Sequence, residues 1–354
     1  MQKIKKGVTV PSAAYGVESK FLKFYQAMPG RVPQVGDIVY GRIVSVGQHS
    51  NLENKSARIH MIHNGSLSVF VFGHRYAPDY YEGHVPEEPV EKVDLLARSG
   101  VVGNVIVKNS LVKDPTKIEV LGYVCTVDGN VVNTLDYNLI NPRLVTKKKS
   151  RAKLVLVCGT SMNSGKSMAA AACCWALSNM GYTVNASKVT GTASLKDILS
   201  MNDAGADKYL DFTYLGYPST YKLSEDKMLD VFNKIDLKYA NDPKKFWVVE
   251  LADGILQRET AMLLAHEDVR SRIHKLIFCS YDAFGAIGGL QVLKEKFELT
   301  PDAISGVCSS SPLHMKELSE FSNIPIFNSA DANLDFMKEI LLSKKKRSKL
   351  AFQS

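Results

Sequence analysis

The chain has 354 residues, enough for two domains, and its 45% hydrophobic and 23% charged residues are typical of a globular protein. The formal net charge is +8, and two short basic runs account for the whole excess. We interpret them as a solvated linker and a solvated tail; the alternative is an electrostatic handle for nucleic acid or an acidic protein. They comprise Lys147, Lys148, Lys149, Arg151 and Lys153, and then Lys344, Lys345, Lys346, Arg347 and Lys349.

Three further features exclude classes of protein. The six cysteines contain no C-x-x-C pair, and several lie in apolar segments, which argues against a disulfide framework or a zinc site. The basic segment 1–9 precedes no apolar stretch of the kind found in signal peptides. No segment approaches the roughly 20 apolar residues of a membrane helix. We therefore expect a cytoplasmic protein that does not span a membrane.

The first part of the chain is patterned as β-strands. Hydrophobic residues alternate with polar ones along several short segments, and Asn64-Gly65 and Asp128-Gly129 mark turns between them. Strong helical patterns are few, so a closed or partly closed small β-barrel is the expected architecture. The predicted strands cover residues 37–46, 57–62, 66–72, 101–107 and 118–124.

Two features of this β-rich half bear on binding. Five of the eight histidines lie between His49 and His84, but His60 and His63 would point to opposite faces of one strand, so we expect no metal site there. The aromatic stretch 72–81 reads as a turn-rich loop. It either binds a partner or substrate, or simply closes the barrel.

After the first basic run, short apolar strands alternate with amphipathic helices. This rhythm predicts βαβ crossovers and a parallel sheet covered by helices on both faces. We expect a β-rich, barrel-like domain over residues 1–148, an α/β domain over 149–342 and a basic tail over 343–354. The predicted strands of the α/β domain are 154–158, 183–189, 246–251, 276–280, 304–308 and 324–327, and the predicted helices begin near Lys166, Ser194, Ser224, Arg258, Gly288, Pro312 and Asp331.

One strand–loop–helix unit carries the strongest chemical signal. An apolar strand leads into a loop, and a helix opens at Lys166, with Met168, Ala171, Ala172, Trp175 and Ala176 on its expected buried face and Gly181 at its end. Backbone N–H groups in such a loop bind phosphates, while the lysine reaches the β- and γ-phosphates and the following hydroxyl ligates Mg²⁺. The predicted phosphate-binding residues are Gly159, Thr160, Ser161, Met162, Asn163, Ser164, Gly165, Lys166 and Ser167.

Three charged residues are further candidates, each near the end of a predicted strand or helix. Glu250 ends an apolar strand, where a carboxylate can serve a metal ion or cap the next helix, and Asp253 could share either task. Lys188 ends another strand and could stabilise a transferring phosphoryl group. We assign catalytic roles to Lys166, Lys188 and Glu250. The hydroxyl-rich segment 210–221 forms either a wall of the substrate pocket or an ordinary loop.

These residues resemble the motifs of dethiobiotin synthetase and its relatives, within the P-loop class that also includes MinD/ParA and the signal-recognition GTPases. The resemblance spans about residues 152–330. Gly159-Thr160 and Gly165-Lys166-Ser167 match the phosphate loop. Lys188 stands where the family has the lysine of Lys-Pro-Val, and Glu250 where it has the glutamate of Val-Glu-Gly-Ala-Gly-Gly. The resemblance implies that Glu250 and Asp203, of Asn202-Asp203-Ala204, hold Mg²⁺; Asp197 and Asp207 are rivals of Asp203.

The sequence also departs from this family. The first glycine of the usual G-x-x-x-x-G-K-[ST] pattern would fall at position 160, which is Thr160, so the lysine that marks MinD/ParA ATPases just after it is missing too. Leu-Ala-Asp253-Gly254 follows Glu250, and Ser309-Ser310-Ser311 stands where the family has an asparagine that contacts adenine. A more distant resemblance is to P-loop N-acyltransferases that act on amino acids.

Three functions fit these observations. The first is an enzyme that uses ATP and Mg²⁺ to activate an acid or carbamate-like group on a small molecule, as a ligase or kinase. The second is an ATPase switch whose nucleotide state controls how the N-terminal domain, or the basic tail, engages a protein or nucleic acid. The third is an acyltransferase whose P-loop binds coenzyme A. A homodimer is compatible with all three.

Overall fold

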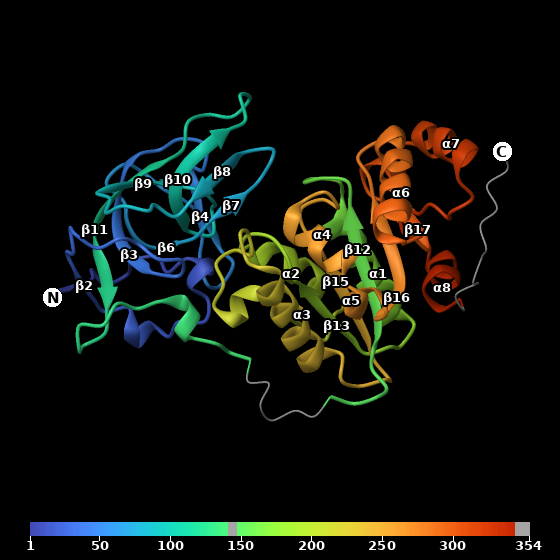
Figure 1. Ribbon diagram of the computed structural model, residues 1–354, viewed down its shortest axis with the longest axis horizontal. Coiled ribbons are helices and arrows are strands. Elements are labelled where there is room, and N and C mark those ends of the chain that lie inside the picture. The colour runs from blue at the N-terminus through green and yellow to red at the C-terminus, as the bar shows by residue number, and fades with distance from the viewer. Residues whose placement is uncertain (141–146, 344–354) are drawn as a thin grey trace.

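The structure is a computed structural model that describes residues 1–140 and 147–343, and it has two lobes side by side along its long axis (Figure 1). A β-rich lobe comes first in the chain and an α/β lobe with a parallel sheet follows, which confirms the predicted fold class. The boundaries predicted at 148/149 and 342/343 stay predictions. The basic tail falls outside the described residues from position 344 onwards. Within the described residues no helix is long and apolar enough to cross a bilayer.

Five strands of the first lobe close into a barrel. The pairs run from β11 to β3, β6, β10 and β9 and back to β11, and only β6 and β10 pair in parallel. Closure leaves none of these strands as a free edge, and their inward side chains form an apolar core. The strands are β3 (Ile38–Ser45), β6 (Leu67–Phe72), β9 (Lys92–Leu95), β10 (Val101–Lys108) and β11 (Lys117–Cys125).

Shorter elements decorate this barrel. The hairpin of β7 and β8 pairs with β10 and extends the sheet beyond the closed ring. Most of these strands have too few residues to show an alternating pattern, and only β5 among them falls within a predicted strand, that over 57–62. They are β1 (Gln2–Lys3), β2 (Phe24–Gln26), β4 (Asn51–Glu53), β5 (Ile59–Met61), β7 (Arg75–Tyr76) and β8 (Tyr81–His84), with 3₁₀ turns at Ser12–Ala14, Ser19–Phe21 and Thr134–Asp136.

The second lobe is built on six parallel strands in the order β14-β13-β15-β12-β16-β17. Parallel strands covered on both faces are apolar throughout, and β12 is buried from its second residue onwards. The strands are β12 (Lys153–Gly159), β13 (Val184–Lys188), β14 (Lys208–Asp211), β15 (Phe246–Glu250), β16 (Ile273–Cys279) and β17 (Ala303–Ser305).

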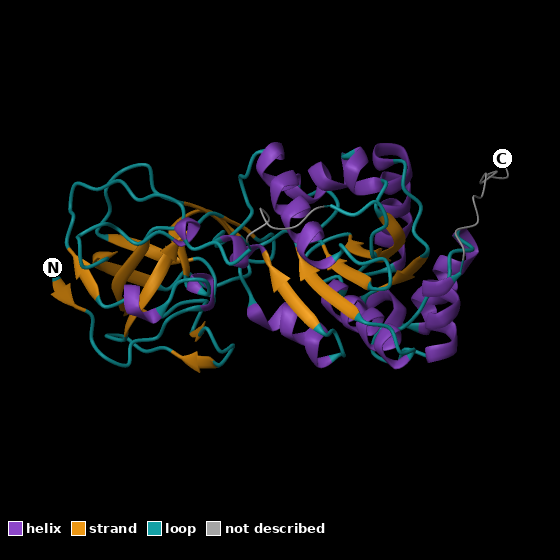
Figure 2. Ribbon diagram, turned by 90° about the horizontal axis from the view of Figure 1, so that it is seen from below, coloured by secondary structure: helices purple, strands orange, loops and turns teal. Residues whose placement is uncertain are grey.

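Helices cover both faces of this sheet, as Figure 2 shows. Val155 and Val157 pack toward α1, α2 and α8, whereas Leu154 and Leu156 pack toward α3, α4, α5 and α6. This alternation follows from the twofold period of a strand. The helices are α1 (Lys166–Asn179), α2 (Leu195–Asp203), α3 (Glu225–Tyr239), α4 (Arg258–Ala265), α5 (Glu267–Arg270), α6 (Ala283–Phe297), α7 (Pro312–Phe321) and α8 (Leu334–Leu342).

Several predicted details of this lobe were wrong. Met168 and Trp175 of α1 are exposed, whereas Ala172 and Ala176 are buried as predicted, together with Ala169, Cys173 and Leu177. The helix is apolar on nearly every side, so its sequence does not indicate which face packs. Helix α6 begins at Ala283 instead of near 288, because Asp282 caps it by accepting a hydrogen bond from the Gly285 N–H at 2.6 Å.

The last predicted strands and helix also differ from the structure. Helix α8 begins at Leu334 after an Asn333 cap, and not at 331. Strand β17 ends at Ser305 and is followed by a glycine and a 3₁₀ turn. The predicted strand 324–327 makes only an isolated parallel bridge between Ile304 and Ile326. Strand β14 and helix α5, four residues each, were not predicted.

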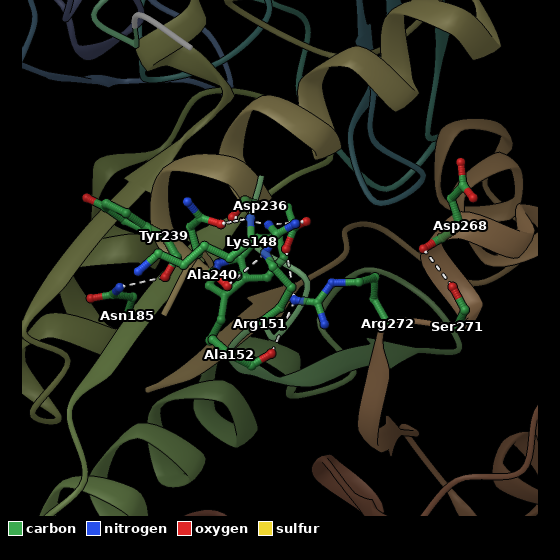
Figure 3. A network of polar contacts seen from close by, with 12 residues as sticks. Lys148, Arg151, Ala152, Asn185, Asp236, Tyr239, Ala240, Asp268, Ser271 and Arg272 are labelled. Atoms are coloured by element: carbon green, nitrogen blue, oxygen red, sulfur yellow. Dashed lines mark hydrogen bonds and ion pairs between the residues drawn. The ribbon is translucent and has the colours of Figure 1, made fainter. Parts of the chain in front are cut away.

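A buried ion-pair network supports the amino-terminal edge of the sheet (Figure 3). The Asp236 carboxylate of α3 accepts from Arg151 at 2.6 Å and from Arg272 at 3.0 Å, and these two guanidinium groups also donate to the carbonyls of Ala240 and Ala152. Lys147, Lys148 and Lys149 are exposed, but the Arg151 side chain is only 6% exposed. The interpretation of the whole run as a solvated linker was therefore wrong for Arg151.

Candidate functional site

The candidate phosphate-binding loop lies at the carboxyl end of β12, where the predicted strand–loop–helix unit is present. Gly165 immediately precedes α1 with φ +92°, a conformation that side chains rarely adopt, and a Cβ there would lie 2.7 Å from the Gly306 Cα. Gly159 is equally restricted, because a Cβ would lie 2.7 Å from the Cys279 carbonyl oxygen. Position 159 therefore needs a glycine because the loop packs closely against β16. The next position in the loop accommodates a threonine, Thr160.

The loop residues have two different tasks. Met162, Asn163, Ser164, Gly165, Lys166 and Ser167 line a cavity, whereas Gly159, Thr160 and Ser161 do not. The Thr160 N–H donates to the Cys279 carbonyl at 2.9 Å, which fixes the start of the loop to the sheet. Because the first N–H groups of an α-helix have no partner within the helix, those at the start of α1 are available to an anion in this cavity.

Lys166 is buried and held close to its own loop. Its ammonium group donates to the Ser161 carbonyl at 2.7 Å and lies 3.5 Å from the Ser164 hydroxyl. No carboxylate forms an ion pair with it among the described residues. A buried ammonium that is not neutralised by a carboxylate is suited to an external anion.

Ser167 and Glu250 meet in the arrangement that a magnesium ion would require. The Ser167 hydroxyl donates to Glu250 Oε1 at 3.1 Å, and Oε2 of the same carboxylate is buried without a hydrogen-bond partner. Burial raises the pKa of Glu250, an effect opposed first by the charge of Lys188. Mg²⁺ takes few protein ligands and keeps waters or phosphate oxygens, so one hydroxyl and one orphaned carboxylate oxygen fit this ion. The described residues hold no cluster of three His, Cys, Asp or Glu suited to a metal.

Three neighbouring strands end in a row of alternating charge. Lys188 of β13 pairs in register with Asp211 of β14 on one side and with Glu250 of β15 on the other. Lys188 also forms an ion pair with Asp197, in the first turn of α2. Burial opposes the charged form of Lys188, but Asp197 and Glu250 outweigh it and raise its pKa above the ordinary lysine value. Lys188 is therefore a fixed cation directly beside the candidate metal site.

The assignment of Asp203 to the metal site was wrong. Asp203 is exposed at the last position of α2, and it does not line the cavity. Asp197, six positions earlier in the same helix, lines the cavity beside Lys188. The local Asp-Ala motif favoured Asp203, but the first turn of α2, and not its last, faces the carboxyl edge of the sheet.

Asp253 lies just beyond Glu250 and is also buried in the cavity. Burial raises the pKa of its carboxyl group, and the charges of Lys188, Lys166 and Arg75 act in the opposite direction. Three cations therefore surround this carboxylate. Two of them come from the α/β lobe and the third, Arg75, comes from the barrel.

The cavity itself, about 820 Å³, is shared between the two lobes. Its barrel side is formed by the segment before and within β4, by the β7–β8 hairpin and by the turn after β9. The volume lies within the range of small-molecule sites, roughly 300–1,000 Å³. Part of the stretch 72–81 thus lines the cavity, and the interpretation that this stretch binds a partner or substrate stays a prediction. No signal in the sequence indicated the other two segments. The barrel residues are Gln48, His49, Ser50, Asn51, Arg75, Tyr76, Ala77, Tyr80, Ala97 and Arg98.

The hydroxyl-rich segment 210–221 contacts the barrel and does not line this cavity. The Tyr221 hydroxyl donates to Glu82 Oε1 at 2.7 Å, and the Gly216 carbonyl accepts from the Thr134 hydroxyl at 2.6 Å. Elsewhere Glu53 of β4 accepts from the Leu195 N–H at 2.9 Å, at the start of α2. These contacts fix the barrel against the α/β lobe and so define the shape of the cavity.

Comparisons with protein families and with curated proteins find no match for this sequence. Solved structures of similar fold include the signal recognition particle receptor FtsY from Elizabethkingia anophelis in complex with GDP, at 11% identity and a TM-score of 0.36 over 60% of this chain and 70% of that one. A ParA family ATPase from Chlorobium tepidum is 16% identical, with a TM-score of 0.34 over 54% of this chain and 90% of that one. FtsY from Mycoplasma mycoides is 15% identical, with a TM-score of 0.32 over 56% of this chain and 70% of that one.

Proposed function

We propose that the α/β lobe binds a magnesium–nucleoside triphosphate and transfers or hydrolyses its γ-phosphoryl group. The contact between the Ser167 hydroxyl and Glu250, with the second carboxylate oxygen buried and unpaired, is the observation that carries this proposal. It places a P-loop hydroxyl and a strand-terminal carboxylate around one point, next to two lysines. A buried carboxylate oxygen without a hydrogen-bond partner calls for an explanation, and a metal ion that it would hold supplies one.

Each residue has a distinct role in this proposal. The N–H groups at the start of α1 bind phosphate oxygens, and Lys166 neutralises the β- and γ-phosphates. Lys188, held in place by Asp197, stabilises the charge on the group being transferred. Mg²⁺, when bound, would supply positive charge that offsets the charge of the phosphates. Ser167 and Glu250 would hold this ion, so positioning and electrostatics supply the rate.

We further propose that the nucleotide is ATP and that the protein acts as a ligase or kinase on a small acid or carbamate-type substrate, as the resemblance to dethiobiotin synthetase implies. The cavity supports an enzyme, because it extends past the P-loop to a second wall on the barrel. A small molecule between the walls would lie beside the γ-phosphate. The coenzyme A alternative has no separate observation in its favour. A cytoplasmic location and a homodimer stay predictions.

One contact favours the ATPase switch as a second candidate. Asn163, in the P-loop, donates to Asp79 of the barrel at 2.5 Å. A loop that binds phosphate and touches the other lobe can transmit nucleotide state to it. Turnover separates the two candidates. Activation by a fraction of small metabolites supports the enzyme, whereas activation by RNA, DNA or a protein supports the switch.

The proposal is tested by titrating the purified protein with ATP, GTP and ADP, each with and without Mg²⁺, in a calorimeter. We expect Lys166→Ala to lower turnover roughly 10²–10³-fold. Glu250→Gln should keep nucleotide binding but lose its dependence on Mg²⁺. Lys153→Ala is a matched control, since this lysine lies over the Phe246 ring at the other edge of the sheet. Absence of affinity for every nucleotide in the wild-type protein would sink the proposal.

A further inference from the structure

The guanidinium group of Arg75 is a buried cation of the barrel that faces the P-loop lobe. Arg75 lies in β7, is 7% exposed and lines the shared cavity. Its Nε is buried without a hydrogen-bond partner, and none of the ion pairs among the described residues includes it. The charge of Asp253 opposes the cost of this burial, but the two side chains form no ion pair, and Lys166 and Lys188 act on the same carboxylate. Burying a cation without a paired anion is costly, so the site is expected to have a further anionic occupant.

The two side chains that contact Arg75 directly orient it and carry no charge. Nη1 lies 2.8 Å from His49 Nε2, and the guanidinium lies over the Tyr80 ring at 5.2 Å from its centroid. Burial, together with the charge of Arg75, lowers the pKa of His49 to about 3, so the imidazole is neutral and accepts the hydrogen bond. Burial lowers the pKa of Arg75 only to about 10, which leaves it a cation at neutral pH.

The cations of the two lobes converge. Arg75, Lys166 and Lys188 all act by charge on the same carboxylate, that of Asp253. Among the residues that line the cavity, basic side chains outnumber acidic ones, and a divalent metal ion would offset the acidic ones further. The basic side chains are Arg75, Arg98, Lys166, Lys188 and Lys196, and the acidic ones are Asp197, Glu250 and Asp253.

Two contacts on either side of Arg75 in the sequence hold this part of the barrel against the α/β lobe. Asp79, four residues after Arg75, accepts the hydrogen bond from Asn163 at the tip of the P-loop. Gly73, two residues before Arg75, packs against Pro218, which a Cβ at position 73 would approach to 3.0 Å. Arg75 is thus held between two contacts with the α/β lobe, and its position opposite the P-loop is a property of the interface.

We propose that Arg75 binds an oxyanion group between the two lobes, so that the barrel completes the active site. This inference rests on the proposed function and names the chemistry of the missing contact: a phosphoryl or carboxylate oxygen that accepts from the guanidinium. The anion is either the γ-phosphate of the nucleotide or an acidic group of the second substrate. Planar guanidinium groups bind both kinds of oxyanion in a bidentate manner.

Calorimetry with defined probes tests the inference. Wild-type protein and Arg75→Ala are titrated with Mg·ADP and with Mg·AMPPNP, a non-hydrolysable triphosphate; the Mg·ADP-loaded proteins are then titrated with inorganic phosphate and with acetate. If Arg75 binds the γ-phosphate, the variant loses at least about tenfold in affinity for Mg·AMPPNP and nothing for Mg·ADP. If it binds the substrate, both nucleotides bind as before, and the loaded variant loses the phosphate or acetate binding of the wild type.

Two controls keep the outcomes distinct. Arg75→Lys retains the charge without the planar fork, and should restore part of the affinity if the guanidinium contacts the anion. Arg42→Ala removes an exposed barrel arginine paired with Glu119 and should change nothing. Equal affinities of wild type and Arg75→Ala for every probe would overturn the inference, as would equal losses for Mg·ADP and Mg·AMPPNP. Absence of Mg·ADP binding in the wild type would instead refute the proposed function.

Discussion

Burial and neighbouring charges shift the pKa values of the ionisable side chains at the carboxyl edge of the sheet. Asp211, in the row with Lys188 and Glu250, accepts hydrogen bonds from the hydroxyl and the N–H of Thr213. Burial is the larger effect and raises the pKa of Asp211 to about 6 from an ordinary value of 3.8. Folding therefore favours the neutral form of this carboxyl more than the unfolded chain does, although the side chain is still mostly ionised at pH 7. Among the described residues of this row, Asp211 has the pKa shift from which a pH dependence of stability follows most directly.

We predict that Asp211 makes the folded protein less stable as the pH rises from 4 to 7. Because the folded-state pKa is raised, stabilisation by the neutral form is fully present below about pH 4 and is lost as the pH rises through about 6. Asp211→Asn stays neutral, so its free energy of unfolding should gain on the order of 3 kcal/mol relative to wild type across this range. Urea unfolding at pH 4, 5, 6 and 7 measures the difference. Parallel curves for the two proteins would contradict it.

At the scale of elements, the sequence predicted the regular strands and the P-loop well, because their signals are local. Buried parallel strands such as β12 and β15 are continuous apolar runs, and the Gly165-Lys166-Ser167 sequence marks the start of α1. The prediction failed where packing decides. The packed face of α1 depends on which neighbours the helix meets, because the helix is apolar on nearly every side. Helix α2 is amphipathic, with Leu195, Ile198 and Met201 buried, but this pattern does not tell which of its turns faces the carboxyl edge of the sheet.

The Asp236 network is an element-scale feature with a measurable effect on stability. We predict that Asp236→Ala lowers the free energy of unfolding by about 3–5 kcal/mol, because it leaves the buried Arg151 and the half-buried Arg272 without their shared carboxylate. Denaturant unfolding gives this value. Asp230→Ala, which removes an exposed acid of the same helix that pairs with the half-buried Lys234, should cost about 0.5 kcal/mol or less. Similar losses in the two variants would show that the network contributes little.

At the scale of the whole molecule, the candidate site belongs to both lobes. The residues from the α/β lobe could be predicted because they lie in one motif and at strand ends. Of the barrel residues, only those of stretch 72–81, which includes Arg75, carried a signal; His49 and Arg98 lie far from it in sequence and join it only when the barrel closes and docks. Asn163 and Asp79, 84 positions apart, illustrate the same limit. Docking contacts of this kind leave no local pattern in a single sequence.

We predict that the Asn163–Asp79 contact couples nucleotide binding to the barrel. Asp79→Ala removes an exposed hydrogen bond that holds the P-loop tip, so the affinity for Mg·ATP should fall by up to about tenfold. By linkage, nucleotide should slow amide hydrogen exchange in residues 73–81 of the wild type and do so less in the variant. Asp128→Ala, an exposed acid in a barrel turn, is the control. Identical affinities and identical exchange in the two variants would contradict the coupling.

The close approach of Gly165 and Gly306 restricts how this protein can change over time. A Cβ on Gly165 would meet the Gly306 backbone, and a Cβ on Gly306 would lie 2.2 Å from the Ser164 carbonyl oxygen. Each position thus excludes a side chain because of the main chain opposite it, and a substitution at one cannot be relieved by a smaller residue at the other, which is already glycine. Descendants of this sequence that keep the loop must therefore inherit both glycines together, or rebuild the turn after β17 in a single step.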